Sequence, residues 1–162
     1  MTRSYYADEA FAMTSSNKPD EVDNCRSGMQ VFARVRAPRD QKHAFLRKPV
    51  LSLDEAESMV SLQGVPEAFV FDGVFGHDVA QEEVFEQTCQ RMGAACASGR
   101  SGSVFTYGQA GAGKTYTIFG SMDSVESLKE GEHRGVAPRA LECTFADLNA
   151  HHGVGRFSCR CS

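Results

Sequence analysis

The sequence predicts an α/β fold, in which strands and helices alternate around one core. Short runs rich in β-branched and aromatic residues occur at residues 29–36, 67–75 and 103–108, and helical patterns follow the second and third runs. A glycine-rich stretch, GQAGAGKT at residues 108–115, connects the third run to the next helix. For a chain of 162 residues, a single domain is expected.

The composition is that of an ordinary globular protein, with 41% hydrophobic and 23% charged residues. The formal net charge of -4 argues against a general nucleic-acid binder, although a local basic patch stays possible. The N-terminal residues contain no apolar core of a signal peptide. We expect no insertion into a membrane, because no apolar run approaches the ~18 residues that a spanning helix needs.

Six cysteines are present, and none forms the C-x-x-C pair of a zinc ribbon or a thioredoxin site. Cys89 and Cys96 are seven residues apart in a helical pattern, which predicts small buried apolar side chains. Reduced thiols, and therefore a cytoplasmic location, are the favoured interpretation.

The first half of the chain predicts an arm followed by strands. Residues 1–28 are polar and mixed in charge without periodicity, so we expect a disordered arm or an extension specific to this protein, and a domain over residues 29–162. Residues 29–36 alternate as a strand does, and residues 49–53 and 58–62 flank a turn as a hairpin would. Residues 67–75 predict a further strand that runs into a glycine turn.

A long helix is predicted after this strand. Asp78 and Gln81 have the spacing of a capping box at its start, and Gly99 is a natural end. One apolar stripe follows the spacing i, i+4, i+7 and i+11, at Phe85, Cys89, Met92 and Cys96.

The second half predicts a strand at residues 103–108 and a helix that begins near Lys114. Residues 120–135 are polar and bounded by glycines, which indicates a surface loop. Pro138 near a first helical turn opens the next helix, whose apolar stripe is Leu141, Phe145 and Leu148 and whose end is Gly153. Residues 156–162 resemble the start of another strand.

The glycine-rich stretch fits the phosphate-loop template G-x-x-x-x-G-K-[ST]. Its glycines allow backbone conformations that a Cβ would forbid, so that several amides can point at phosphate oxygens. Lys114 then supplies a cation to the β- and γ-phosphates, and the Thr115 hydroxyl can bind Mg²⁺. A chance glycine-rich turn is the alternative, but a strand before and a helix after are the context of a phosphate loop.

The loop alone does not identify the NTPase, because many nucleotide kinases and GTPases also contain it. In those proteins it follows the first strand, whereas about a hundred residues precede it here.

The ordered motifs of the chain resemble those of the kinesin motor domain. The similarity runs from VFARVRAP at residue 31 to the last residue. It includes FVFDGVF, QEEVFEQ, SVFTYGQAGAGKTYTIFG, GVAPRALECTF and RFSCRCS. Myosin is the nearest rival, since its phosphate loop is similar, but it shares neither the F-x-F-D-x-V-F strand nor the Tyr107–Gln109 lead-in.

The resemblance implies a phosphate-loop NTPase fold of the kinesin motor type, with a central, mostly parallel sheet, helices on both faces, and an incomplete C-terminal side. It implies an ATPase that binds ATP and Mg²⁺ and moves along microtubules in the cytoplasm as part of the cytoskeleton. It implies no nucleic-acid partner, and it leaves the oligomeric state open.

The resemblance also implies roles for single residues. Arg34 and Pro38 border the adenine, although Ala37 stands at the family's proline position, and Tyr116 stacks on the base. An ordinary strand-edge arginine and a core tyrosine are the alternatives. Ala110 replaces the family's usual threonine and keeps the amide. The expected nucleotide-binding residues are Arg34, Pro38, Gly108, Gln109, Ala110, Gly111, Ala112, Gly113, Lys114, Thr115 and Tyr116, and the expected metal ligand is Thr115.

The family's N-x-x-S-S-R-S-H and D-x-x-G-x-E segments are absent from these 162 residues. We therefore assign no catalytic residue within the chain and expect it to be inactive alone. A truncated, non-catalytic nucleotide-binding or interaction fragment is the alternative, and the reading frame downstream would distinguish the two. Residues 121–134 match a family loop that borders the nucleotide pocket, and His133, His151 and His152 are expected on the surface.

Overall fold

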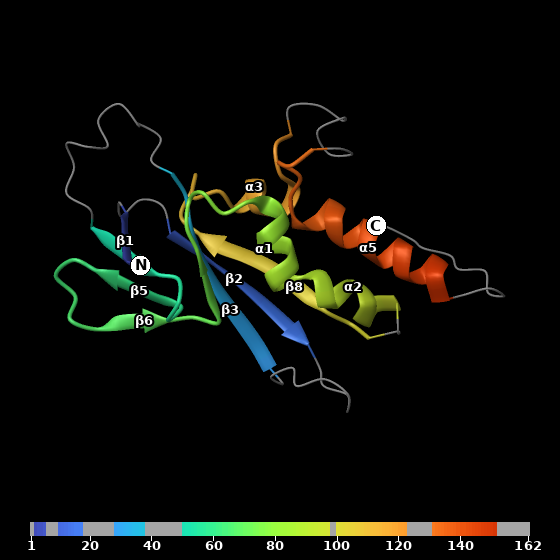
Figure 1. The fold of residues 1–162 in the computed structure, drawn as a ribbon, viewed down its shortest axis with the longest axis horizontal. Coiled ribbons are helices and arrows are strands. Elements are labelled where there is room, and N and C mark those ends of the chain that lie inside the picture. The colour runs from blue at the N-terminus through green and yellow to red at the C-terminus, as the bar shows by residue number, and fades with distance from the viewer. Residues whose placement is uncertain are drawn as a thin grey trace.

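The computed structural model describes residues 2–5, 10–17, 28–37, 50–97, 100–122 and 131–151. Two four-stranded sheets and a group of helices form the described part of the chain (Figure 1). This arrangement confirms the α/β class. Pro38, residues 156–162 and three of the six cysteines lie outside the described residues.

The larger sheet has the strand order β7 (Gly73–Phe75), β3 (Gly28–Val35), β2 (Ala10–Asn17), β8 (Ser103–Gly108). β3 pairs with β7 in parallel, and β2 is antiparallel to both β3 and β8. Consequently β7, β3 and β8 run in one direction and β2 runs against them. The expected strands at residues 29–36 and 103–108 are confirmed as β3 and β8.

The smaller sheet is antiparallel throughout, with the order β1 (Thr2–Tyr5), β4 (Leu51–Asp54), β5 (Met59–Leu62), β6 (Ala68–Val70). β4 and β5 form the expected hairpin. The expected single strand over residues 67–75 is instead divided into β6 and β7. The amide of Phe71 donates to the carbonyl of Ser58, in the turn just before β5 of the smaller sheet. The amide of Asp72 donates to the carbonyl of Val31 in β3 of the larger sheet, so the chain crosses between the sheets there.

The N-terminal residues differ from the expected disordered arm. β1 extends the smaller sheet and β2 lies between β3 and β8, with Phe11 opposite Arg34 on one side and Gly108 on the other. The predicted boundary between an arm and a domain at residue 28 stays a prediction.

The predicted helix after β7 is two helices, α1 (Gln81–Thr88) and α2 (Gln90–Ala97), separated at Cys89. The capping-box prediction is wrong, because the N-cap is Ala80 and no side chain caps the helix. Cys89 is fully buried as expected, whereas Cys96 is exposed because α2 starts a new helical phase after the break. α3 (Lys114–Phe119) and α5 (Val136–His151) confirm the other two expected helices.

The apolar stripe predicted for α5 is wrong, because a different face of the helix is buried. Leu141 and Phe145 are about half exposed, and the helix instead turns Val136, Ala140 and Cys143 toward the core. Small side chains let α5 lie close to α2: a Cβ added at Gly93 would lie 2.7 Å from the Cys143 sulfur. Figure 1 shows α5 running alongside α2.

Two apolar clusters cover the two faces of β3 and β7. The first joins Phe32 and Phe75, whose rings stack 5.9 Å apart, to Val84 and Phe85 of α1 and Val136 of α5. The second packs alternate residues of β3 and β7 against Leu51 and Leu53 of β4 and Val60 of β5. In the described residues the smaller sheet therefore covers the face for which the resemblance implies helices.

The chain alternates strictly along β8. Val104 packs against the first cluster, while Phe105 and Tyr107 point to the other side and are largely exposed. β8 is an edge strand of the larger sheet among the described strands, and its face that carries Phe105 and Tyr107 is uncovered. No helix among the described residues has the length and apolar character needed to cross a membrane.

Candidate nucleotide-binding site

The glycine-rich loop joins the end of β8 to the start of α3, so that strand, loop and helix follow one another as predicted. Gly111 and Gly113 have φ values of +83° and +105°, which side chains with a Cβ rarely adopt. The amide of Ala112 donates to the carbonyl of Gln109 at 3.2 Å, closing a turn within the loop. The sequence therefore places glycine where the backbone requires it.

Lys114 is the first residue of α3, and its side chain lies back along the loop. The Lys114 Nζ is 2.8 Å from the carbonyl of Gly108 and 2.7 Å from that of Gln109. The neighbouring Thr115 is exposed. A cation and a hydroxyl thus lie at the junction of the glycine loop and the first turn of α3, which fits a phosphate with its Mg²⁺.

Arg36 is a residue of this site that the sequence analysis did not find. Its guanidinium donates to the carbonyl of Gly111, so it ties the end of β3 to the loop. The signal was present, since Arg34 and Arg36 are two residues apart and side chains at that spacing on a strand share a face.

A cavity of about 440 Å³ lies beside the loop. Its position brings together β3, α3, the glycine loop and the segment before α1. The residues that line it are Arg34, Val35, Arg36, Ala37, His77, Ala112, Gly113, Tyr116 and Thr117. Four expected site residues therefore meet at one cavity, namely Arg34, Ala112, Gly113 and Tyr116.

Arg34 is buried, with 8% of its surface exposed. Its Nη1 donates to Gln81 Oε1 at 2.7 Å and to Thr117 Oγ1 at 2.9 Å. Burial lowers the pKa of the Arg34 guanidinium, although arginine stays charged at neutral pH. The structure thus directs Arg34 into the cavity wall, which an ordinary strand-edge arginine would not reach.

Tyr116 is 40% exposed, so it is not a core tyrosine. The Arg34 guanidinium carbon lies 5.6 Å from the centre of its ring, within the range of a cation–π contact. Its hydroxyl is 3.4 Å from His133 Nδ1 on the far side of the loop that follows α3. His133 is exposed, as expected, and the side chains of His151 and His152 lie outside the described part of the chain.

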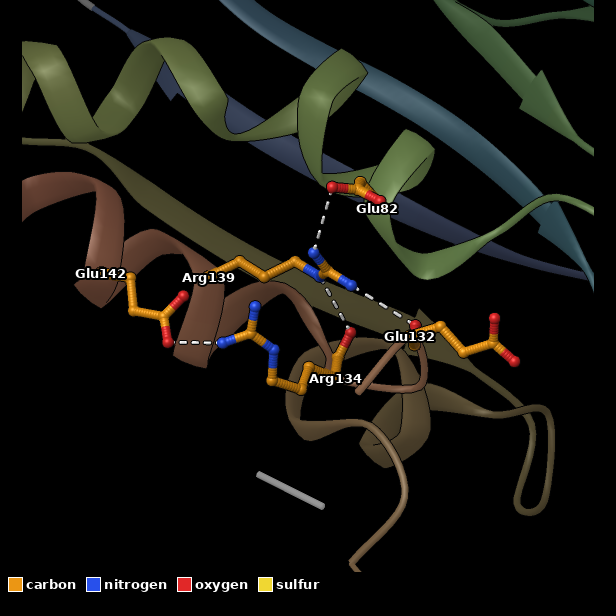
Figure 2. A network of polar contacts seen from close by, with 5 residues as sticks. All are labelled: Glu82, Glu132, Arg134, Arg139 and Glu142. Atoms are coloured by element: carbon orange, nitrogen blue, oxygen red, sulfur yellow. Dashed lines mark hydrogen bonds and ion pairs between the residues drawn. The ribbon is translucent and has the colours of Figure 1, made fainter. Parts of the chain in front are cut away.

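A polar network closes the loop after α3 onto α5 and α1 (Figure 2). Arg139 of α5 is nearly buried and donates to the carbonyls of Arg134 and Glu132 at 3.2 and 3.4 Å. Its Nη1 also lies 3.7 Å from Glu82 Oε1 at the start of α1. Arg134 forms an ion pair with Glu142, which lies about one helical turn after Arg139 in α5.

The family model for the kinesin motor domain matches residues 19–162. The chain belongs to the kinesin motor family. It resembles the rat protein named Kinesin-like protein KIF15, with 34% identity over 91% of the chain, and the mouse protein of that name, with 40% identity over 91%. It also resembles Kinesin-like protein KIN-12B of Arabidopsis thaliana, with 32% identity over 84% of the chain.

This kinesin chain spans about one tenth of the length of these relatives, 11% of the rat and mouse proteins and 10% of the plant one. The family model covers the glycine loop, α3, α5 and the strands β3, β7 and β8 of the larger sheet, whereas β2 precedes its first matched residue. The described site thus occupies the part of the chain that is similar to kinesin motors.

Proposed function

We propose that this chain is the ATP-binding front portion of a microtubule-based motor, which in the whole protein couples ATP hydrolysis to movement along microtubules. The observation that carries the proposal is the position of Lys114 on a strand–loop–helix turn directly beside the cavity lined by Arg34 and Tyr116. The kinesin motor family supplies the class of reaction.

The loop would hold the phosphates. Gly108, Gln109, Ala110 and Gly111 provide backbone around them, Lys114 provides the cation, and Thr115 provides the hydroxyl for Mg²⁺. When bound, Mg²⁺ neutralises charge on the β- and γ-phosphate oxygens.

The cavity would hold the nucleoside. Its volume of about 440 Å³ lies within the range of roughly 300–1,000 Å³ of small-ligand pockets. The half-exposed ring of Tyr116 offers a flat face to a base, and Arg34 holds that ring from one side. Ala37 lines the cavity where the family has a proline, so the base rests on the tyrosine side.

Partners and location follow from the family and belong to the proposal. The whole protein would bind microtubules and act in the cytoplasm as part of the cytoskeleton. The curated relatives are named kinesin-like proteins.

Substituting Lys114→Ala tests the assignment of the phosphate loop. Removing the cation should weaken the binding of a fluorescent ATP analogue in Mg²⁺ by at least about tenfold, the loss of a charge-assisted contact. Arg100→Ala is the control, because it removes an exposed positive charge at the opposite end of β8. Equal affinity of Lys114→Ala and wild type would contradict the assignment.

A further inference from the structure

We propose that Gln81, the first residue of α1, is a positioning residue that sets the base-binding end of the cavity through Arg34 and Tyr116. The proposal rests on the proposed binding of a nucleotide at this site and names a residue that gives the site its preference for a base.

Both ends of the Gln81 amide are used. The side chain is 2% exposed; its Oε1 accepts from Arg34 Nη1 at 2.7 Å, and its Nε2 donates to the backbone carbonyl of Tyr116 at 2.6 Å. An arginine can only donate and a carbonyl can only accept, so one orientation of the amide satisfies both partners. Gln81 therefore links β3, α1 and α3 at a single buried point.

Arg34 depends on this link. Its guanidinium is buried, and no carboxylate among the described residues pairs with it: its acceptors are Gln81 and Thr117, and its other neighbour is the Tyr116 ring. A buried cation needs such acceptors to stay in place. Removing the Gln81 oxygen leaves Thr117 alone to hold a group that lies against the proposed base platform.

Gln81 also contacts the backbone of Tyr116. Its Nε2 donates to the Tyr116 carbonyl, which accepts the amide of Gly120 at 2.7 Å as well, so Gln81 is one of two donors that hold the backbone from which the ring projects toward the cavity. The first turn of α1 is itself anchored, because the next residue, Glu82, lies 3.7 Å from Arg139 (Figure 2). Gln81 thus acts from the first turn of α1 on the two residues that line the base end, and neither of its two hydrogen bonds is to the glycine loop.

Because Gln81 contacts residues at the base end of the cavity, its loss should affect a ligand that has a base more than a ligand that has phosphates alone. Dissociation constants of the 162-residue chain for Mg²⁺–ATP and for Mg²⁺ with inorganic triphosphate are measured by calorimetry. For Gln81→Leu we expect ATP to bind about tenfold more weakly, the loss of one hydrogen bond to a charged group, while triphosphate changes by less than about twofold. Gln87→Leu, the same change at an exposed position of the same helix, should alter neither constant.

A second variant covers a failure to fold. Gln81→Glu keeps an acceptor for Arg34 but sets a carboxylate against the carbonyl of Tyr116, so we expect a smaller but still selective loss for ATP. Equal losses for both ligands, no loss, or unfolding of both variants by circular dichroism would overturn the positioning role. The double variant Gln81→Leu with Arg34→Leu should lose less ATP affinity than the sum of the two single losses, because the two residues share one contact; fully additive losses would overturn the positioning role.

The outcomes separate the two proposals. If wild type binds neither ligand, the proposed function fails. If wild type binds both and Gln81→Leu retains full preference for ATP, only the positioning role fails.

Discussion

At the scale of single residues, Tyr116 has one partner over its ring and another at its hydroxyl. Arg34 lies over the ring, and His133 meets the hydroxyl from the loop that follows α3. The ring is neither packed in the core nor fully free in solvent, since 40% of it is exposed. A tyrosine in this position can present a flat ring face to the cavity, while Arg34 and His133 fix the orientation of the ring.

Tyr116→Ala should weaken ATP binding more than the binding of inorganic triphosphate, because only ATP has a base to stack. Stacking of a base on an aromatic ring is worth about 1–3 kcal/mol. Tyr116→Phe is the matched control: it keeps the ring and loses the contact with His133, so ATP affinity should stay near that of wild type. Equal weakening of both ligands by Tyr116→Ala would mean that the tyrosine only supports the structure.

At the scale of the elements, the loop after α3 is closed at its base by two backbone segments in contact. Gly120 forms a bridge with Arg134, the amide of Ser121 donates to His133, and the amide of Gly135 donates to Phe119. The approach is close, since a Cβ at Gly120 would lie 2.1 Å from the carbonyl oxygen of His133. The loop therefore leaves α3 and returns to α5 through a narrow neck.

Substituting Gly120→Ala should destabilise the chain by more than Gly64→Ala. Both glycines have similar positive φ values, +89° and +84°, but only Gly64 has open space around a new Cβ. The change at Gly64 should cost about 1–2 kcal/mol for the left-handed backbone alone, and the change at Gly120 should add the clash with His133. Urea unfolding gives both free energies, and equal losses would show that the neck is not closed.

At the scale of the whole molecule, the larger sheet of the described chain is packed on both faces at one edge and exposed to solvent on one face at the other edge. Apolar clusters lie on both faces of β3 and β7, whereas Phe105 and Tyr107 on β8 are 56% and 75% exposed. The phosphate loop begins at the end of this less covered strand. The residues proposed to bind the nucleotide thus lie next to a strand with one uncovered face.

Residues 1–162 should show no microtubule-stimulated ATPase. Phosphoryl transfer depends on positioning and electrostatic stabilisation, and Lys114 and Thr115 supply only part of the shell around the phosphates and the metal. The measurement is steady-state phosphate release by the purified chain with and without polymerised tubulin. Stimulated turnover by these residues alone would contradict the expectation, while turnover restored by a polypeptide with the family's N-x-x-S-S-R-S-H and D-x-x-G-x-E segments would support it.

The elements that the sequence predicted correctly are those whose conformation depends on a few adjacent residues. Glycines at fixed spacing before Lys114 predicted the phosphate loop, because the requirement for left-handed backbone belongs to single residues. Alternation predicted β3, and a short apolar run predicted β8. Two runs that flank a turn predicted the β4–β5 hairpin, and Pro138 predicted the first turn of α5. The order of these motifs also carried the similarity to the kinesin motor family.

Other features depend on partners far away in the chain, and no local pattern contains them. Gln81 has the spacing of a cap, yet its amide is used by Arg34 and Tyr116, which are 47 and 35 residues away. The buried face of α5 is decided by the close approach of Gly93 to Cys143, and the division between β6 and β7 by hydrogen bonds to two different sheets. Local conformational preference is a property of a few adjacent residues, whereas burial and hydrogen-bond partners arise only when distant segments pack together.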